Sequence, residues 1–280
     1  MYPILFRFPD AIPLLGGHAL RSFSVMVLIG VLMGAWWVGR AFKKQGIEQS
    51  GAVDHLVRNA LICGFIGARM LYLVVHPEAY ENLVSLIAVW QGGIVSYGGF
   101  FGGAFGAWLF ARRWKIPFVR LGDAALPALF LGQVFGRIGC LLVGDDHGAP
   151  WNGPWAITFS GVEESLIPSH LVGVPLHPSQ IYLSLMNLVI FLICITIGKR
   201  RRFDGQVFSV GLILYAVGRF CVEMTRGDDA ARGIYGAFST SQWVSLGTAV
   251  LGLVMLIKLR HGPLTRGATP PGHLAKATVV

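Results

Sequence analysis

Two arginines lie inside long apolar stretches of this sequence, where a charged group is costly and is therefore commonly functional. Arg137 belongs to the segment Gly136-Arg-Ile-Gly-Cys-Leu-Leu-Val-Gly-Asp-Asp-His-Gly148, whose glycines expose backbone N–H groups and allow a ligand to approach closely. Arg219 lies four residues before Glu223, so the two side chains share one helix face. A guanidinium forms two parallel charge-assisted bonds to a phosphate. The pattern fits an anion site, and it fits equally an alternative in which Arg137 pairs with Asp145, Asp146 or Glu223 and only ties helices together.

The two arginines are expected on different helices near the same membrane face, where together they would clamp one phosphate. Their neighbours are apolar, so the phosphate of a lipid head fits this setting better than a soluble anion does. Glu223 is expected to hold Arg219 in place while Arg219 offers its remaining donors to the anion. Arg226 follows directly in the polar run Thr225-Arg-Gly-Asp-Asp229.

A glycine-rich apolar segment carries a polar pair, Ser96-Tyr97, at its start. Glycines recur at every fourth position after it, which is typical of closely packed membrane helices. Packing explains the glycines but not Tyr97, which is a candidate proton carrier, hydrogen-bond donor or interfacial anchor. The two stripes are Gly98, Gly102, Gly106 and Gly99, Gly103.

Other kinds of catalytic site lack support in the sequence. The run His177-Pro-Ser-Gln180 fits a helix start with Ser179 near the cap, and no nucleophile elbow supports a Ser/His hydrolase. The histidines and cysteines do not show metal-ligand spacing. No phosphate-binding loop or dinucleotide fingerprint is present. The sequence therefore predicts no metal and no cofactor.

These residues must be positioned by membrane helices. The chain has 280 residues, of which 54% are apolar and only 13% charged, with 37 glycines and a mean hydropathy of +0.61. Such a chain cannot cover a water-facing surface, which excludes a soluble domain, a disordered chain and a disulfide scaffold. A spanning helix needs about 20 mostly apolar residues. Seven segments qualify and predict an all-α integral membrane protein, a seven-transmembrane-helix bundle: 20–39, 57–75, 89–111, 122–143, 179–198, 206–224 and 242–258.

Basic residues predict the orientation of this bundle, because cytoplasmic loops carry an excess of Lys and Arg. Sixteen of the 23 Lys and Arg residues fall in one set of loops, which places the N-terminus outside and the C-terminus in the cytoplasm. The net charge of +9 is thus topological and does not indicate nucleic-acid binding. The remaining parts are an interfacial arm (1–19), a small extracytoplasmic cap (144–177, with a strand over 155–159) and a disordered cytoplasmic tail (259–280).

Several segments, in their order and spacing, resemble one family, the bacterial prolipoprotein diacylglyceryl transferases. The resemblance runs from Arg21 to Ile257, and its strongest element is the segment from Gly136 to Gly148. The supporting elements are Trp90-Gln-Gly-Gly93, Tyr97-Gly98-Gly99, His177-Pro-Ser-Gln-Ile-Tyr182, Phe203-Asp-Gly-Gln206, Gly218-Arg219 with Glu223, Arg226-Gly-Asp228 and Ser239-Thr-Ser-Gln-Trp243.

The resemblance implies an activity. A diacylglyceryl group would move from phosphatidylglycerol to the lipobox cysteine of a preprolipoprotein signal peptide, giving a thioether and releasing glycerol phosphate in the first step of lipoprotein maturation. The enzyme would lie in the bacterial inner membrane among membrane lipids, with its active site facing the outer leaflet. The implied catalytic residues are Arg137, Arg219, Tyr97 and Glu223, and the implied substrate-binding residues are Gly98, Gly99, Gly139, Cys140, Asp145, Gly148, His177, Gln180 and Arg226.

The chain departs from the family pattern at the position of a general base. Tyr97 stands where members often have the histidine of a His-Gly-Gly turn. A phenol, with a reference pKa of about 10, is a poor base at neutral pH, so Tyr97 is expected to orient the lipid head, or to accept a proton only if an arginine lowers its pKa. His147 is the nearest replacement, although a histidine in a polar outer loop is expected to be solvated.

Further departures lie in the signature and in the fifth helix. Cys140 and Val143 stand where asparagines are usual, and Asp145 and Leu183 where glutamates are usual. These differences leave an altered paralogue as an alternative, one that binds phosphatidylglycerol or modifies another acceptor. A lipid-head or anion transporter is a third interpretation, but the sequence lacks the interior chain of carboxylates or histidines that a polar path to the cytoplasm needs.

Overall fold

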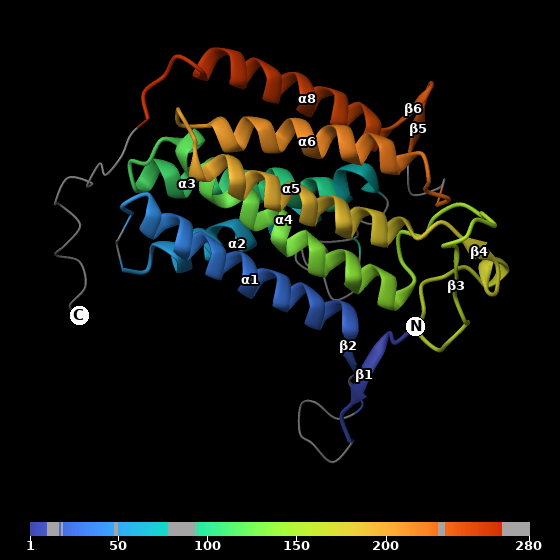
Figure 1. The fold of residues 1–280 in the computed structure, drawn as a ribbon. Coiled ribbons are helices and arrows are strands. Elements are labelled where there is room, and N and C mark those ends of the chain that lie inside the picture. The colour runs from blue at the N-terminus through green and yellow to red at the C-terminus, as the bar shows by residue number, and fades with distance from the viewer. Residues whose placement is uncertain are drawn as a thin grey trace. The chain divides into compact units, whose positions relative to one another are not determined.

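Seven long α-helices follow one another along the part of the chain that the computed structural model describes, residues 1–9, 17, 19–47, 50–77, 93, 95–228 and 233–264 (Figure 1). They match the seven predicted apolar segments in order. Their bounds are α1 Ser22–Lys44, α2 Ala52–Val75, α3 Ser96–Arg113, α4 Phe118–Val143, α5 Ser179–Lys199, α6 Gln206–Glu223 and α8 Thr240–Leu259.

Six of these helices, all except α3, are long and apolar enough to cross a membrane, counting only residues with a described position. Many of their large apolar side chains are exposed, as expected for helices that face acyl chains, for example Leu28 and Leu32 on α1. This is the architecture of an all-α multi-pass membrane protein. Helix α3 has 18 residues and begins at Ser96 rather than at residue 89. Residues 89–92 and 94 of that predicted segment, and with them Trp90-Gln-Gly of the predicted Trp90-Gln-Gly-Gly93 motif, lie outside the described residues.

Short antiparallel strand pairs accompany the helices. Strand β1 (Ile4–Arg7) pairs with β2 (Ala19–Arg21), so the predicted N-terminal arm contains a hairpin. The strand expected over 155–159 is shorter, since β3 covers Ile157–Thr158 and pairs with β4 (Pro175–Leu176). A 3₁₀ turn, η4 (Ser169–Leu171), lies between them. The third pair is β5 (Ile234–Tyr235) with β6 (Phe238–Ser239).

The chain divides into two compact units, residues 1–37 with 122–264, and residues 38–121 among those described. The first unit buries an apolar core between α4, α5 and α6 that includes Phe130, Ile190 and Val207. Helices α1 and α4 approach closely through glycines in the same unit. A Cβ added to Gly30 would lie 2.7 Å from the carbonyl oxygen of Gly132.

In the second unit, the glycine stripe of α3 packs directly on α2, as predicted. A Cβ added to Gly98, Gly102 or Gly106 would overlap a backbone carbonyl oxygen of α2, from Gly67, Cys63 or Asn59 respectively. The second stripe is looser, because the same Cβ on Gly99 or Gly103 would meet α2 only at ordinary contact distance. Gly98, Gly102 and Gly106 are therefore required by helix packing.

Polar residues fix the starts of two helices. Asp123, a charged residue within α4, accepts hydrogen bonds from the backbone N–H groups of Gly205 and Phe208, both at 2.8 Å, and so caps α6. Ser239 is the N-cap of α8, in a capping box with Gln242. All four cysteines carry free thiols.

Candidate active site

Arg137, in the last turns of α4, forms an ion pair with Asp146. The helix ends at Val143, and two residues with left-handed backbone, Gly144 (φ 81°) and Asp146 (φ 53°), reverse the chain direction. The Asp146 carboxylate is thereby returned to the Arg137 guanidinium, nine residues earlier in the sequence. Both side chains are largely buried, with 17% and 23% of their surface exposed.

Arg226, just after α6, joins the same carboxylate. Its Nη2 donates to Oδ1 of Asp146 at 2.5 Å, while Arg137 donates to Oδ2. Arg226 also donates through Nε to Asp228 at 2.8 Å. One carboxylate thus bridges two guanidiniums, one with each oxygen. We call Asp146 with Arg137 and Arg226 the Asp146 bridge.

The charges of the bridge are mutually stabilising. Burial alone would raise the pKa of Asp146, but the guanidiniums of Arg137 and Arg226 outweigh it and hold this pKa below its ordinary value. Burial opposes the charge of Arg226, yet the carboxylates of Asp228 and Asp146 raise its pKa above the usual range. The pKa of Asp145 is raised by desolvation and by the adjacent Asp146 charge. Asp146 is therefore an anion and Arg226 a cation at neutral pH.

The loop that carries Asp145 and Asp146 is attached to the start of α5. Ser179 Oγ donates to the backbone carbonyl of Asp146, and Gln180 Nε2 donates to that of Asp145, both at 2.7 Å. Neither Ser179 nor Gln180 is exposed. Ser179 was predicted near the helix cap, but Pro178 takes the N-cap position and Ser179 serves the loop instead. The His-Pro-Ser-Gln run thus holds the backbone beneath the bridge.

Arg219 and Glu223 form the predicted i,i+4 ion pair on α6, and Glu223 is completely buried. Arg219 also donates through Nη2 to Ser241 Oγ, in the first turn of α8, at 2.9 Å. The charge of Glu223 contributes to the raised pKa of Arg226, so this pair and the Asp146 bridge belong to one electrostatic network. Arg137 and Arg219, predicted to share one phosphate, are connected in this structure through Asp146, Arg226 and Glu223.

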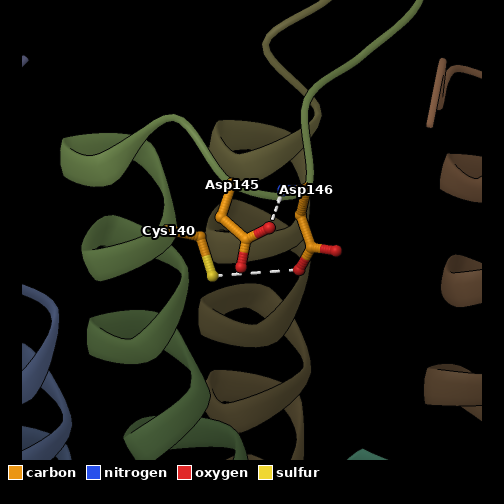
Figure 2. A group of neighbouring side chains, drawn as sticks. All are labelled: Cys140, Asp145 and Asp146. Atoms are coloured by element: carbon orange, nitrogen blue, oxygen red, sulfur yellow. Dashed lines mark hydrogen bonds between the residues drawn. The ribbon is translucent and has the colours of Figure 1, made fainter. Parts of the chain in front are cut away.

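Cys140 lies beside the two aspartates, and its Sγ is 3.8 Å from Oδ2 of Asp146 (Figure 2). Potential metal ligands of Cys140, Asp145 and Asp146 lie within 4.8 Å of one another. However, both oxygens of Asp146 already accept from guanidiniums, and two nearby positive charges repel a cation. The donor set therefore suits an arginine–carboxylate network better than a metal centre.

The predicted substrate glycines of this region make close contacts within the protein. A Cβ on Gly139 would lie 3.1 Å from Cδ2 of Phe23 on α1. A Cβ on Gly148 would overlap the backbone of His177, and Gly148 pairs with Arg226 in an isolated β-bridge. Close packing within the protein therefore explains why both positions are glycine.

Two histidines between α4 and α5 are held within the fold. The His177 ring stacks on Trp151 with centroids 4.3 Å apart, and its Nδ1 is 3.3 Å from the Tyr182 hydroxyl. His147 was expected to be solvated, and this is wrong. It is only 7% exposed, and its Nδ1 lies 3.2 Å from the Gly148 carbonyl oxygen. The chain reversal at Asp146 turns His147 inward.

Tyr97, Gly98 and Gly99 belong to the second unit, where Tyr97 is half-buried in the first turn of α3. The same unit holds Arg69, a buried arginine of α2 that the sequence analysis did not select. Its Nη1 donates to the Gly93 carbonyl at 2.9 Å, and its guanidinium lies 5.4 Å from the Tyr72 ring centroid. The sequence signal that could have identified Arg69 as a candidate functional residue is its position as a charged residue within an apolar segment.

Asp146, the central residue of the bridge, was predicted only as one of three possible partners of Arg137, and this pairing is confirmed, whereas Asp145 was the aspartate predicted to bind substrate. Adjacent aspartates point in different directions, and spacing alone does not tell which one faces inward. The left-handed backbone at Asp146 decides this and is a property of the folded loop. Asp228 and Ser241 were missed for a similar reason, because their partners are set by the packing of α6 and α8.

The comparison with known proteins is consistent over nearly the whole chain. The family model of the prolipoprotein diacylglyceryl transferases matches residues 9–258. A phosphatidylglycerol–prolipoprotein diacylglyceryl transferase of Clostridium tetani is 30% identical, over 90% of this chain and 96% of the relative. Proteins of the same name from Finegoldia magna and Geobacter sulfurreducens are 31% and 32% identical, over 87% and 91% of this chain and 93% and 94% of their own lengths. The chain therefore belongs to the prolipoprotein diacylglyceryl transferase family.

Proposed function

We propose that this protein is a transferase that moves the diacylglyceryl group of phosphatidylglycerol to a cysteine thiol of a prolipoprotein. Membership of the family over residues 9–258 is the observation that carries this function, together with the shared name of its relatives. The acceptor is the lipobox cysteine of a signal peptide, and the product is a thioether. The buried arginine–carboxylate network at the ends of α4 and α6 supports the proposal, because the reaction needs fixed positive charge near a lipid phosphate.

The chemistry is a substitution at the glyceryl carbon attached to the phosphate. The acceptor sulfur, having lost its proton, forms an S–C bond as the C–O bond to phosphate breaks. The bonding electrons leave with the oxygen, and glycerol phosphate departs. The phosphate therefore gains negative charge in the transition state, and preorganised donors aimed at it lower the barrier.

Arg137 and Arg219 are the residues we assign to that charge, with Arg226 beside them. Each guanidinium is held by a carboxylate: Arg137 and Arg226 by Asp146, and Arg219 by Glu223. These pairs fix the direction of the guanidiniums before the lipid binds, which reduces the reorganisation needed during the reaction. Tyr97 is assigned to orientation of the lipid head.

The proposed topology follows from the basic loops and the apolar helices. Helix α3 (Ser96–Arg113) is the remaining span, which makes seven spans in the bacterial inner membrane. The N-terminus and the cap (144–177) lie outside, and the C-terminus lies in the cytoplasm. The ends of α4 and α6 then face the outer leaflet, where phosphatidylglycerol enters sideways from the bilayer.

A direct assay tests the function. The purified full-length chain is incubated with phosphatidylglycerol and a lipobox peptide, and the peptide is analysed by mass spectrometry. We expect a diacylglyceryl adduct on the cysteine, none with a Cys→Ser peptide, and none when phosphatidylcholine replaces phosphatidylglycerol. Absence of the adduct from folded protein, with failure to rescue a strain depleted of its own transferase, would instead favour an altered paralogue.

A further inference from the structure

The Asp146 carboxylate uses its two oxygens as a phosphate diester would use its two non-bridging oxygens. Oδ1 accepts from Arg226 at 2.5 Å, and Oδ2 accepts from Arg137. Both groups carry a single negative charge, and both suit the donor geometry of guanidinium groups. The same guanidinium donors therefore suit the phosphate of phosphatidylglycerol. The lipid phosphate and the Asp146 carboxylate would compete for these donors.

Burial makes this competition strong. Arg226 is 8% exposed, and the Arg137 side chain is 17% exposed, so neither guanidinium is well hydrated. Leaving a poorly hydrated cation without an anionic partner is strongly destabilising, and this applies above all to Arg137, because Arg226 also pairs with Asp228. The low pKa of Asp146 keeps the carboxylate charged for this purpose.

The backbone of the loop is held in place, so the exchange of Asp146 for the lipid phosphate has to be made by movement of the Asp146 side chain. Hydrogen bonds from Ser179 and Gln180 hold the backbone carbonyls of Asp146 and Asp145 on the start of α5. A turn about χ1 of Asp146 is then enough to withdraw its carboxylate. Arg226 still has Asp228, to which it donates at 2.8 Å through Nε, so it stays aligned after Asp146 leaves.

We propose that Asp146 is a positioning residue that holds Arg137 and Arg226 in register and is displaced from them by the phosphate of phosphatidylglycerol. This inference rests on the proposed function and names the group with which the lipid head competes. Asp146 thereby lowers the apparent affinity for the lipid, because the donors are available only in the fraction of molecules in which it has turned away.

The isosteric variant Asp146→Asn separates a competitor from a structural tie. Loss of the charge removes the competitor, so we expect the KM for phosphatidylglycerol to fall by about three- to tenfold. Asp146→Glu restores the anion, and its KM is not expected to fall. A residue that only ties the helices would produce the opposite result, a raised KM. An unchanged or raised KM in folded Asp146→Asn would overturn the proposal.

Ligand-induced stabilisation provides a measurement that does not require turnover. Thermal unfolding of the full chain is followed in a zwitterionic detergent with and without phosphatidylglycerol. The lipid should raise the midpoint of Asp146→Asn by more than that of the unaltered protein, because its phosphate supplies the anionic partner that the neutral amide does not. The matched control is Glu163→Gln, a surface carboxylate paired with Arg7 at 3.2 Å, and it should respond as the unaltered protein does.

The remaining outcomes are also decisive. If Asp146→Asn folds only when phosphatidylglycerol is present, the lipid phosphate replaces the carboxylate, as proposed. If it fails to fold with or without the lipid, Asp146 is a structural tie and the proposal is wrong. Soluble glycerol phosphate at the same concentration should give a smaller shift, and an equal shift would reject the assignment to a lipid head. A larger lipid response of Asp146→Asn without any peptide adduct from the unaltered protein would contradict the proposed reaction but not this inference.

Discussion

Arg226 Nη2 lies 2.5 Å from Oδ1 of Asp146, although 80 residues separate the two in the sequence. The contact joins the loop after α4 to the segment after α6, and Arg137 completes it from within α4. Three segments are thus fixed around one carboxylate. The proposed lipid substrate carries a single phosphate, which could occupy the place of that carboxylate. The predictions below separate the chemical role of this network from its structural role.

Arg137→Lys should lower the rate of transfer by about 10²–10³-fold, the usual effect of removing one preorganised donor to a developing oxyanion. Lysine keeps the charge but lacks the planar fork that serves two acceptors. Arg137→Ala should abolish transfer while the protein remains folded. The readout is initial rate in the peptide assay, and Arg7→Lys, on a side chain that is 49% exposed, is the control. Substantial activity in Arg137→Ala would disprove its role at the phosphate.

Arg219 and Glu223 call for a double-mutant cycle. Arg219→Gln leaves a carboxylate that is completely buried without its partner, which we expect to cost about 3–5 kcal/mol of stability. The double variant Arg219→Gln with Glu223→Gln removes both charges and should recover most of that stability. Transfer should stay absent in both, because the donor to the phosphate is gone. A double variant that regains activity would show that Arg219 acts only as a structural tie.

Tyr97→Phe tests whether the phenol carries a proton. We expect a raised KM for phosphatidylglycerol and an unchanged pH profile of kcat, since a phenol with a reference pKa of about 10 is suited to orientation and not to proton abstraction near neutral pH. Steady-state kinetics between pH 6 and about 9 are the measurement. A pH profile that loses one limb in the variant would instead make Tyr97 a proton carrier.

Neighbouring glycines of α3 provide a matched pair for helix packing. In Gly98→Ala the new Cβ would overlap the Gly67 carbonyl oxygen and lie 2.7 Å from Cβ of Leu71, so we expect a loss of about 1–3 kcal/mol. In Gly99→Ala the nearest atom, Cβ of Ala68, is 3.7 Å away, and stability should be nearly unchanged. Thermal unfolding of the two variants is compared. Reduced transfer in Gly99→Ala with unchanged stability would point to lipid contact at that residue.

The stability that Asp146 contributes should depend on pH. Its pKa in the folded protein is below the ordinary value, so its ion pairs stabilise the fold above the unfolded pKa of about 4. That contribution is lost as the pH falls through the lower, folded value. Asp146→Asn should therefore be less stable than the unaltered protein in phosphatidylcholine at pH 7, by about 1–3 kcal/mol. The difference should narrow below pH 4, and a gap independent of pH would argue against the ion pairs as its cause.

The helices could be predicted because their cause is local. Continuous apolar segments of sufficient length identified α1, α2, α4, α5, α6 and α8, and the glycine stripe identified the packing face of α3. The ends were less predictable. Helix α4 begins at Phe118 rather than at residue 122, and α8 begins at Thr240 rather than at residue 242. Turns and capping residues set the ends of these helices, and a hydropathy pattern does not report them.

The sequence by itself determined that this is a helical membrane protein of the diacylglyceryl transferase family, with Arg137 and the Arg219–Glu223 pair as charged groups within its apolar helices. The Arg219–Glu223 pair could be predicted from the sequence because side chains four residues apart meet on any helix. Only the tertiary structure decided that Arg137 and Arg226 share Asp146 and not Asp145. Partners that are distant in sequence are selected by how helices pack and by the left-handed backbone of one loop residue, and neither is encoded in the spacing of charges along the chain.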